Sequence, residues 1–361
     1  MSADPGLASW LQLTLTPGLG AAAIRGLLEQ FGLPENILAA PRAQLERVAG
    51  PAAAALQHSE ETAAAVRNAL RWAESPGHAV VTLADAAYPR LLLEIADPPP
   101  LLYAVGRLEL LGRPALAIVG SRNATAQGVR NAEQFARAFS AAGLTIVSGM
   151  ALGIDAAAHA GGLAGEGSTI AVLGTGVDVT YPRQNAALAQ RIAQSGLLLS
   201  EFALGSAGAA HHFPRRNRLI SGLAQGCLVV EAALASGSLI TARAAAEQGR
   251  EVFAIPGSIH SPLAKGCHAL LKQGAKLVES AEDVLAELTA FQRIATASTR
   301  APSPPAADEP LLAHMGFDPV DVDSICARAG LAAERVSAEL LRLELAGRVA
   351  ALPGGMYQRL N

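Results

Sequence analysis

The spacing of apolar and polar positions changes between residues 72 and 78. Before this point, apolar residues recur at helical spacing, which predicts helices at Leu7–Leu15, Ala21–Phe31, Pro41–Ala49 and Ser59–Trp72. After it, short apolar runs alternate with longer stretches in which apolar residues recur at helical spacing. The pattern therefore predicts an N-terminal helical domain at residues 1–75, followed by a domain of a different class.

The turn between the first two predicted helices, Thr16–Gly20, reads Thr-Pro-Gly-Leu-Gly. A tight turn of this kind resembles a helix–hairpin–helix, so we expect a helix–hairpin–helix or SAM-like domain. Such a turn can offer backbone N–H groups to a DNA phosphate. A simple turn between two packed helices explains the same residues, and the sequence leaves both interpretations open.

The apolar runs after residue 78 predict strands. They are Ala79–Leu83, Leu116–Val119, Thr145–Val147, Thr169–Leu173, Leu197–Leu199, Leu228–Val230 and Val252–Ile255. The segments of helical length between them are Gln127–Ala142, Ile154–Leu163, Gln184–Gln194, Pro214–Ala224 and Leu239–Gln248. Several runs are continuously apolar, as in strands covered on both faces. This alternation predicts an α/β fold at residues 78–290, an extended Rossmann-like, doubly wound parallel sheet.

The C-terminal part changes character again. Residues 291–310 are rich in Pro, Ala, Ser and Thr and predict a linker. Residues 311–361 predict helices at Asp321–Ala329 and Ala332–Gly347 and then a hairpin at Val349–Leu360, the order of a winged helix. The second helix carries both acidic and basic residues, which favours protein contact or a structural role over reading of a DNA groove.

Composition limits how the chain can meet nucleic acid. Of its 361 residues, 51% are hydrophobic and 16% charged, and the net charge is −3. Proteins that coat nucleic acid non-specifically carry a strong positive excess. Any nucleic-acid site in this chain must therefore depend on arginines gathered in one place, and not on an overall positive charge.

The remaining composition indicates a cytoplasmic protein. The three cysteines, Cys227, Cys267 and Cys326, have neither metal-ligand spacing nor the pattern of a disulfide framework. The first residues lack the basic start and apolar run of a signal peptide, and no apolar run is long enough for a membrane span. We expect no metal and no cofactor.

A first candidate site follows the predicted strand Leu116–Val119. Ligands of open α/β sheets bind beyond the carboxyl ends of the strands, and Gly120, Ser121 and Arg122 stand at such an end, just before a helix. Glycine lets a phosphate approach the backbone, Ser121 and the first helical amides can donate to it, and Arg122 adds a bidentate charge. A glycine turn with a solvated arginine is the alternative.

A second candidate site lies in a stretch without acidic residues, from Phe202 to Val230. Its predicted helix opens with basic side chains at the positive end of the helix dipole, where cations are unfavourable. A bound anion would offset that cost. We therefore expect DNA or phosphate contacts at Phe213, Arg215, Arg216, Asn217 and Arg218, with a solvated basic face as the alternative.

Three further loops also follow predicted strands. Gly174–Val179 begins like a dinucleotide fingerprint but lacks the last glycine, so it fails as an NAD signal. Asp155 and His159 share a helix face as metal ligands or an acid–base pair would, but a structural role is favoured.

Glu231 is either a buried acid or a cap for the adjoining loop. The residues that we add to the predicted contacts are Gly149, Met150, Gly153, Ser236, Gly237 and Ser238.

These segments, in this order, resemble the DNA-processing protein A (DprA/Smf) family. The resemblance covers nearly all of residues 78–290. Two departures stand out: Gln127 replaces a common tyrosine, and His268 a common asparagine. The matching segments are Tyr88-Pro89, Asp97–Tyr103, Ile118–Arg122, Ser148–Asp155, His159, Tyr181-Pro182, Asn185, Ser200–Phe202, Phe213–Arg218, Val229–Ala232, Ser236–Ala242, Ile255–Gly257 and Gly266-Cys267.

The resemblance implies a function. It implies a recombination mediator without known catalysis, which binds single-stranded DNA, dimerises, protects incoming strands during natural transformation and helps to load the RecA recombinase. The implied phosphate pocket is Gly120, Ser121 and Arg122, with Arg215, Arg216 and Arg218 beside it. A nucleotide phosphoribohydrolase on the same core is an alternative, but its Pro-Gly-Gly-x-Gly-Thr loop is missing. A protein–protein adaptor is another.

Overall fold

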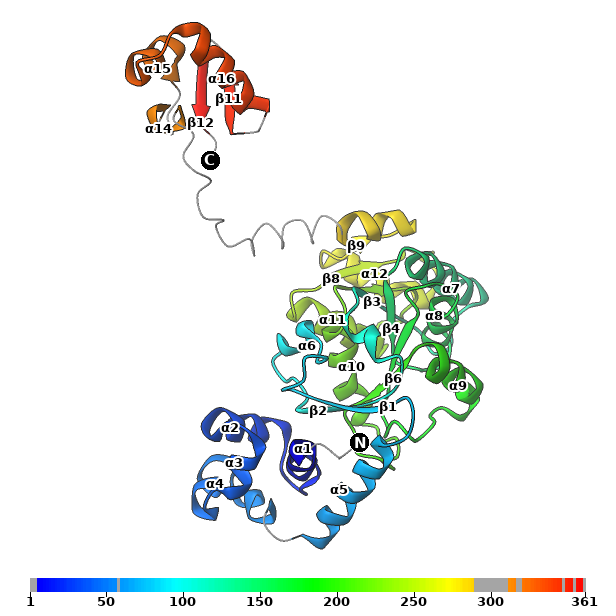
Figure 1. Cartoon of the computed structure of the whole chain (residues 1–361). Coiled ribbons are helices and arrows are strands. Elements are labelled where there is room, and N and C mark those ends of the chain that lie inside the picture. Colours follow the sequence, from blue (N-terminus) through cyan, green and yellow to red (C-terminus); the bar gives the residue numbers. More distant parts are fainter. Residues whose placement is uncertain are drawn as a thin grey trace. The chain divides into compact units, whose positions relative to one another are not determined.

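A computed structural model describes residues 5–56, 59–288, 311–315, 320–345, 348–352 and 355–359. The chain divides into two compact units, Met1–Thr289 and Ala290–Asn361 (Figure 1), which are described separately. The predicted linker at 291–310 lies outside the described residues, and the predicted domain limits stay predictions. Among the described helices, none has both the length and the apolar character needed to span a membrane.

The first unit contains a nine-stranded sheet in the order β1-β2-β6-β5-β4-β3-β7-β8-β9. All the pairings from β6 to β9 are parallel. This confirms the predicted α/β class and its mostly parallel sheet. The strands are β1 (His78–Thr82), β2 (Leu101–Gly106), β3 (Ala115–Val119), β4 (Thr145–Ser148), β5 (Thr169–Val172), β6 (Leu197–Ser200), β7 (Gly226–Val229), β8 (Glu251–Ala254) and β9 (Lys276–Leu277).

The first predicted strand does not belong to the parallel part. Strand β1 pairs antiparallel with β2, and β2 pairs antiparallel with β6. A parallel crossover needs a dozen or more residues, usually a helix. The connection between β1 and β2 holds only the four-residue helix α6 (Arg90–Leu93), so the chain turns back antiparallel.

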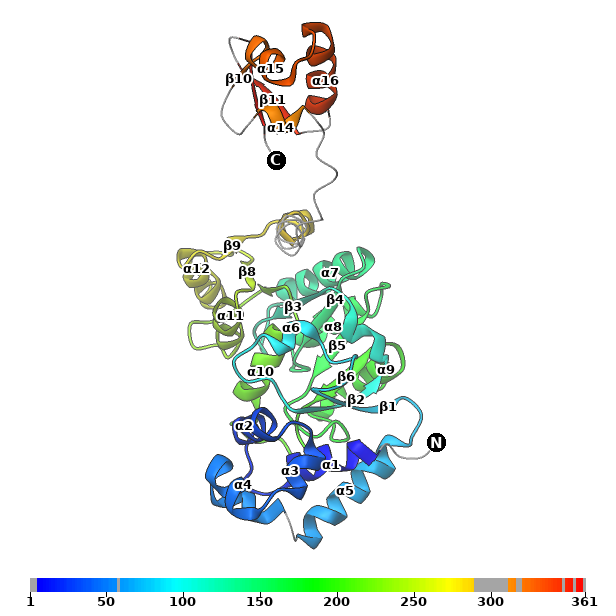
Figure 2. The ribbon, with the colours of Figure 1, turned by 60° about the vertical axis from the view of Figure 1, so that its left-hand side comes forward.

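Helices cover both faces of the sheet (Figures 1 and 2). One face carries α7 (Ala126–Ala141), α8 (Ile154–Gly162) and helical residues 281–288, and their buried apolar residues form one core. The other face carries helix α6 and α10 (His212–Gly222), α11 (Ser238–Glu247) and α12 (Lys265–Lys272). Helix α9 (Ala186–Ser195) and the 3-10 turns Leu108–Gly112, Arg183–Asn185 and Pro262–Ala264 complete this part.

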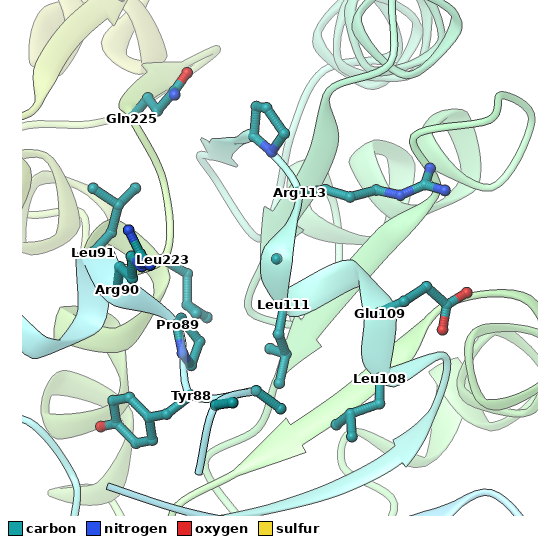
Figure 3. Close-up of a pocket in the computed structure, with 14 residues that line it drawn as sticks. Tyr88, Pro89, Arg90, Leu91, Leu108, Glu109, Leu111, Arg113, Leu223 and Gln225 are labelled. Atoms are coloured by element: carbon teal, nitrogen blue, oxygen red, sulfur yellow. The ribbon is translucent and has the colours of Figure 1, made fainter. Parts of the chain in front are cut away.

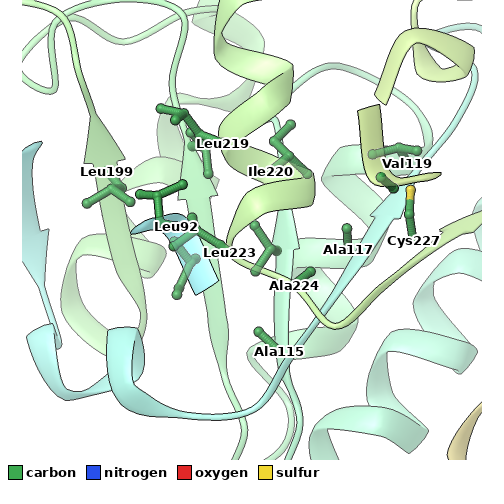
Figure 4. Close-up of a cluster of buried hydrophobic side chains, with 14 of the residues drawn as sticks. Leu92, Ala115, Ala117, Val119, Leu199, Leu219, Ile220, Leu223, Ala224 and Cys227 are labelled. Atoms are coloured by element: carbon green, nitrogen blue, oxygen red, sulfur yellow. The ribbon is translucent and has the colours of Figure 1, made fainter. Parts of the chain in front are cut away.

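Strand β3 shows why its sequence is continuously apolar. Successive side chains of a strand point to opposite faces. Ala115, Ala117 and Val119 belong to the core beneath α10, whereas Leu116 and Ile118 belong to the core beneath α7 and α8. Figure 4 shows the first of these cores, where Leu219 and Ile220 of α10, and Leu223 directly after it, meet the β3 side chains. Both faces are therefore buried, and no polar position interrupts the strand.

The N-terminal helices have a core of their own and also pack on the sheet. They are α1 (Pro5–Leu15), α2 (Ala21–Phe31), α3 (Pro34–Ala39), α4 (Arg42–Ala49) and α5 (Glu60–Ala73), with a 3-10 turn at Pro51–Leu56. Leu13, Leu27 and Leu45 lie in the local core. Trp10 of α1 packs in one cluster with Tyr103 of β2, so the helices and the sheet form one unit.

The second unit has the element order of a winged helix. Its sheet has the order β10-β12-β11, and its core includes Leu312, Ile325, Val336 and Leu340. The predicted helices and hairpin are present with ends shifted by a few residues. The elements are α14 (Leu312–Met315), β10 (Val320–Asp321), α15 (Val322–Ala329), α16 (Ala333–Leu345), β11 (Val349–Leu352) and β12 (Met356–Arg359).

Candidate nucleic-acid interface

Strand β3 marks the point where the order of the sheet reverses. It pairs with β4 on one side and with β7 on the other. In such sheets, ligands bind in the crevice outside the carboxyl ends of the strands at this switch point. A cavity of about 710 Å³ lies there, lined by the loop after β3, the first turn of α10 and the loop that leads into α11.

The cavity gathers most of the predicted contacts. The lining residues among them are Gly120, Ser121, Arg122, Phe213, Arg216, Asn217, Ser236, Gly237 and Ser238. The predicted contacts that do not line it are Gly149, Met150, Gly153, Arg215 and Arg218. The lining residues that sequence reasoning missed include Ile240 and Thr241, which lie within one helical turn of Ser238. A helix start at Ser238 was the available signal for them.

Positive charge faces this cavity. The exposed guanidinium of Arg122 has its Cζ atom 5.8 Å from the centre of the Phe213 ring. Helices α10 and α11 begin at the cavity. The N-cap residue of α10, His211, forms no side-chain cap, whereas at α11 the Ser236 Oγ accepts from Ser238 N–H at 3.3 Å. The positive ends of two helix dipoles therefore add to the charge of Arg122, which suits an anionic ligand.

The N-terminus of α7, by contrast, is already occupied. The Glu231 carboxylate accepts hydrogen bonds from Thr125 N–H at 2.9 Å and from Thr125 Oγ1 at 2.6 Å. Thr125 Oγ1 accepts in turn from Gly128 N–H. The Glu231 carboxylate therefore stands at the end of α7 where we predicted a phosphate, and donation by the first amides of this helix stays a prediction. Glu231 is thus neither of the two predicted alternatives: it is half-buried, and it caps the start of α7 rather than its own adjoining loop.

Arg216 lies beneath the cavity and is 4% exposed. Its Nη1 donates to Gly149 O at 2.6 Å and also to Val172 O. A side chain at Gly149 would place its Cβ 2.6 Å from the same Nη1, so this glycine admits the guanidinium. Burial lowers the pKa of Arg216 to about 10, and the nearby Asp155 opposes that shift. Arg216 remains a cation, but its donors already serve the protein.

Asp155 and His159 hold the turn after β4. Asp155 Oδ2 accepts from the N–H groups of Gly149 at 3.1 Å and Ala151 at 3.3 Å. His159 Nε2 accepts from Met150 N–H, while Nδ1 lies 2.7 Å from Thr169 Oγ1. Burial raises the pKa of Asp155 and lowers that of His159 to about 3. These contacts agree with the structural interpretation of the pair.

The same turn fits closely against the loop after β3. Met150 is buried and has a φ of 63°, and Gly153 has a φ of 75°. A Cβ atom at Gly153 would lie 2.4 Å from Ser121 O, so the two loops touch through backbone alone. Gly149, Met150 and Gly153 therefore support the cavity from behind. Direct contact of these residues with a ligand stays a prediction.

Arg215 and Arg218 face a different partner. The Glu201 carboxylate, whose side chain is 2% exposed, lies 3.0 Å from Arg215 Nη2 and 2.7 Å from Arg218 Nη2. Arg218 also lies 3.2 Å from Asp97, which pairs with Arg25 of the N-terminal helices at 2.5 Å. The electrostatic cost that we attributed to a missing ligand anion is therefore met by Glu201. DNA contact by Arg215 and Arg218 stays a prediction.

A second cavity, of about 540 Å³, lies at the opposite edge of the sheet. Its lining residues Pro114 and Gln225 directly precede β3 and β7. Figure 3 shows Glu109 and Arg113 extending away from the segment that carries Tyr88. None of the predicted contacts lies in this cavity. Because ligands of open α/β sheets bind at the carboxyl edge, the first cavity is the candidate site.

Comparison with known proteins identifies the family of this chain. The family model described as DNA recombination-mediator protein A matches residues 79–289, and a DprA winged helix domain matches residues 295–355. The chain belongs to the DNA recombination-mediator protein A family. The resemblance to DprA/Smf drawn from the sequence is thereby confirmed, and so is the winged-helix class of the second unit.

Relatives and solved structures cover much of the chain. Protein Smf of Escherichia coli is 43% identical over 309 residues, which cover 82% of this chain and 81% of that protein. An X-ray structure of DNA processing protein A from Streptococcus pneumoniae matches with a TM-score of 0.67 and 41% identity, covering 77% of this chain and 95% of that one. A structure of DNA processing protein A from Helicobacter pylori, which concerns its single-stranded DNA binding mode, matches with a TM-score of 0.54 and 32% identity, covering 59% and 96%.

Proposed function

We propose that the cavity beyond β3 and β7 binds single-stranded DNA and that the protein acts in the cytoplasm as a recombination mediator. The observation that carries this proposal is the exposed Arg122 beside the Phe213 ring, at the positive ends of two helices. Sites for single strands combine positive charge for phosphates with aromatic surfaces for bases. The matching structure of DNA processing protein A from Helicobacter pylori also concerns the binding of single-stranded DNA.

Each part of the cavity has a role in this proposal. Arg122 contacts a phosphate, and the helix ends of α10 and α11 add positive potential. Arg216 joins the turn after β4 to the last residue of β5 through Gly149 O and Val172 O, and thereby positions the floor of the cavity. Because the net charge of the chain is −3, binding depends on these few groups rather than on a general positive field.

A salt-dependent titration of the full chain with a labelled oligo(dT) tests the proposal. We expect log K to fall with log salt, by roughly 0.7 for each phosphate that is neutralised. Arg122→Ala should lower this slope by about that amount and weaken binding to every sequence alike, because phosphate contacts carry no base information. Arg130→Ala, an exposed arginine on α7, is the matched control. Unchanged binding of Arg122→Ala would contradict the assignment.

The mediator role has its own measurements. We propose that the protein is a homodimer that protects incoming strands during natural transformation and helps RecA to assemble on them. Light scattering after gel filtration gives the oligomeric state. Nuclease protection of a single strand and RecA assembly on that strand are then compared with and without the protein. If the protein binds the single strand but RecA assembles no faster, the mediator role is refuted and the DNA-binding proposal stands.

The enzyme alternative is not favoured. The relatives with matching sequences bear the names Protein Smf and DNA processing protein DprA, and the loop expected of a phosphoribohydrolase is missing from the sequence. Incubation of the full chain with nucleoside monophosphates, followed by chromatography of the free base, tests this directly. Release of base that depends on Arg122 would overturn our preference.

A further inference from the structure

An exposed ring stands next to the cavity, in the loop that follows β5. Tyr181 is 50% exposed, and among the described residues it is the only aromatic one of the strongly exposed large apolar side chains. Its ring centre lies 5.4 Å from that of Phe213, and the guanidinium of Arg122 lies 5.8 Å from the same Phe213 ring. A guanidinium and two rings thus lead from the cavity to the surface.

Gly174 makes room for the Phe213 ring, and Gly208 lies beside both rings. A Cβ atom at Gly174 would lie 2.8 Å from Phe213 Cδ1. A Cβ atom at Gly208 would lie 3.4 Å from Phe213 Cζ and 3.8 Å from the Tyr181 ring. The Gly174–Val179 segment, which fails as a dinucleotide fingerprint, therefore has a different use. It lets Phe213 pack against the backbone so that Tyr181 can rest beside it.

The loop that carries Tyr181 is held in place and ends in a cation. Asn185 Nδ2 donates to Met150 O at 2.9 Å and to Ala151 O at 3.2 Å, which ties the loop to the turn after β4. Arg183 is exposed and has no ion pair with any residue that the structure describes. The loop's own carboxylate, Asp178, accepts from Gly205 N–H at 2.9 Å.

We propose that Tyr181 stacks on a base of the single strand as it leaves the cavity, and that Arg183 contacts an adjoining phosphate. The inference rests on the proposed function and extends it, because it gives the strand a path over the surface, from Arg122 across Phe213 to Tyr181. Every base has a π face, so stacking on an exposed ring tolerates any sequence. A half-exposed tyrosine and an exposed arginine two residues further along the chain offer both kinds of contact that a single strand needs.

Two variants two residues apart should show different signatures. Tyr181→Ala should weaken binding of oligo(dT) on the order of 10-fold, the effect of losing one stacked base, and leave the salt slope unchanged. On an oligonucleotide with abasic sites, Tyr181→Ala should bind like the parent. Arg183→Ala should lower the salt slope by roughly 0.7 on both oligonucleotides. Tyr181→Phe should match the parent throughout.

Controls separate this inference from the proposed function. Leu33→Ala removes another exposed apolar side chain, on the N-terminal helices, and should leave binding unchanged. If Tyr181→Ala binds oligo(dT) like the parent while Arg122→Ala does not, the stacking inference is wrong and the DNA site stands. An equal loss on abasic DNA would also overturn it, since the ring would then support the loop. If the parent binds no single strand, both proposals fail.

Discussion

Replacing Arg216 by methionine removes the buried guanidinium beneath the cavity and keeps an unbranched side chain. The donors to Gly149 O, at 2.6 Å, and to Val172 O are lost. These carbonyls belong to the turn after β4 and to the last residue of β5, which the guanidinium joins. The buried carboxylate of Asp155 also loses its neighbouring cation. We therefore expect the main effect of Arg216→Met to be on stability.

The expected magnitude follows from burial. A buried carbonyl left without its donor costs about 1–3 kcal/mol, and Arg216→Met leaves two of them. Asp155 also loses the nearby positive charge, although such costs are not additive. We expect a loss of about 4 kcal/mol in the free energy of unfolding, which lowers the Tm by roughly 10 °C for a unit of this size. Asp155→Asn in the same chain should restore part of the loss.

The pH dependence of the variant gives a second check. Burial raises the pKa of Asp155, and the Arg216 charge opposes that shift, so its removal raises the pKa further. A folded-state pKa above the unfolded value means that the folded protein binds more protons, and stability then rises as the pH falls through that pKa. Arg216→Met should therefore recover stability relative to the parent as the pH is lowered toward the ordinary range of a carboxyl group.

Urea unfolding followed by tryptophan fluorescence measures these differences, since Trp10 packs in the first unit. DNA binding of the variant is measured at a temperature where it remains folded. If Arg216→Met is as stable as the parent and loses only DNA affinity, Arg216 is a direct phosphate contact and the structural account of it is refuted.

Three further predictions concern groups around the site. Burial holds the pKa of His159 at about 3. The free energy of unfolding should therefore fall by about 1.4 kcal/mol for each pH unit below pH 6.5. His159→Gln should flatten this pH dependence, as measured by urea unfolding. Gly128→Ala would place a Cβ 2.4 Å from the Glu231 carboxylate carbon. The carboxylate must then move away from Thr125, and loss of this cap should cost about 1 kcal/mol of unfolding free energy in urea unfolding. Stability equal to the parent's would show that the cap adds nothing to it. Arg25→Ala breaks the partly exposed pair with Asp97 and should cost less than about 1 kcal/mol by calorimetry; a larger loss would show that the pair holds the N-terminal helices in place.

The apolar pattern predicted most of the first unit's sheet and the helices between its strands. Strand β3 is an example, because burial on both faces leaves a sequence signal that needs no knowledge of partners. The antiparallel pairing of β1 and β2 left no such signal, since strands of either direction have the same periodicity. Their direction depends on the connection, whose only α-helix, α6, is four residues long.

The roles of the arginines of α10 were only partly visible in the sequence. Arg216 stands three and four residues before the buried Leu219 and Ile220, so helical spacing already puts it on the core face. Arg215 and Arg218 are three apart and share another face, which explains why both reach Glu201. The spacing cannot name Glu201 as that partner, because it depends on where the end of β6 meets the helix.

The cap of α7 was also beyond sequence reasoning. Glu231 and Thr125 are 106 positions apart and meet only because β3 and β7 are neighbours in the sheet. The exposure of Tyr181 likewise depends on which loops surround it. Long-range contacts of this kind decide which of several basic or aromatic residues stay available to a ligand.

Photo-cross-linking of the full chain to an oligo(dT) that carries a photoreactive base tests the central claim most directly. Mass spectrometry of the digested complex identifies the residues joined to DNA. The account predicts cross-links in the loop at Gly120–Asn123 and at Phe213, and their loss in Arg122→Ala at matched concentration. Cross-links confined to the cavity at the amino ends of the strands, or to the winged helix, would contradict it.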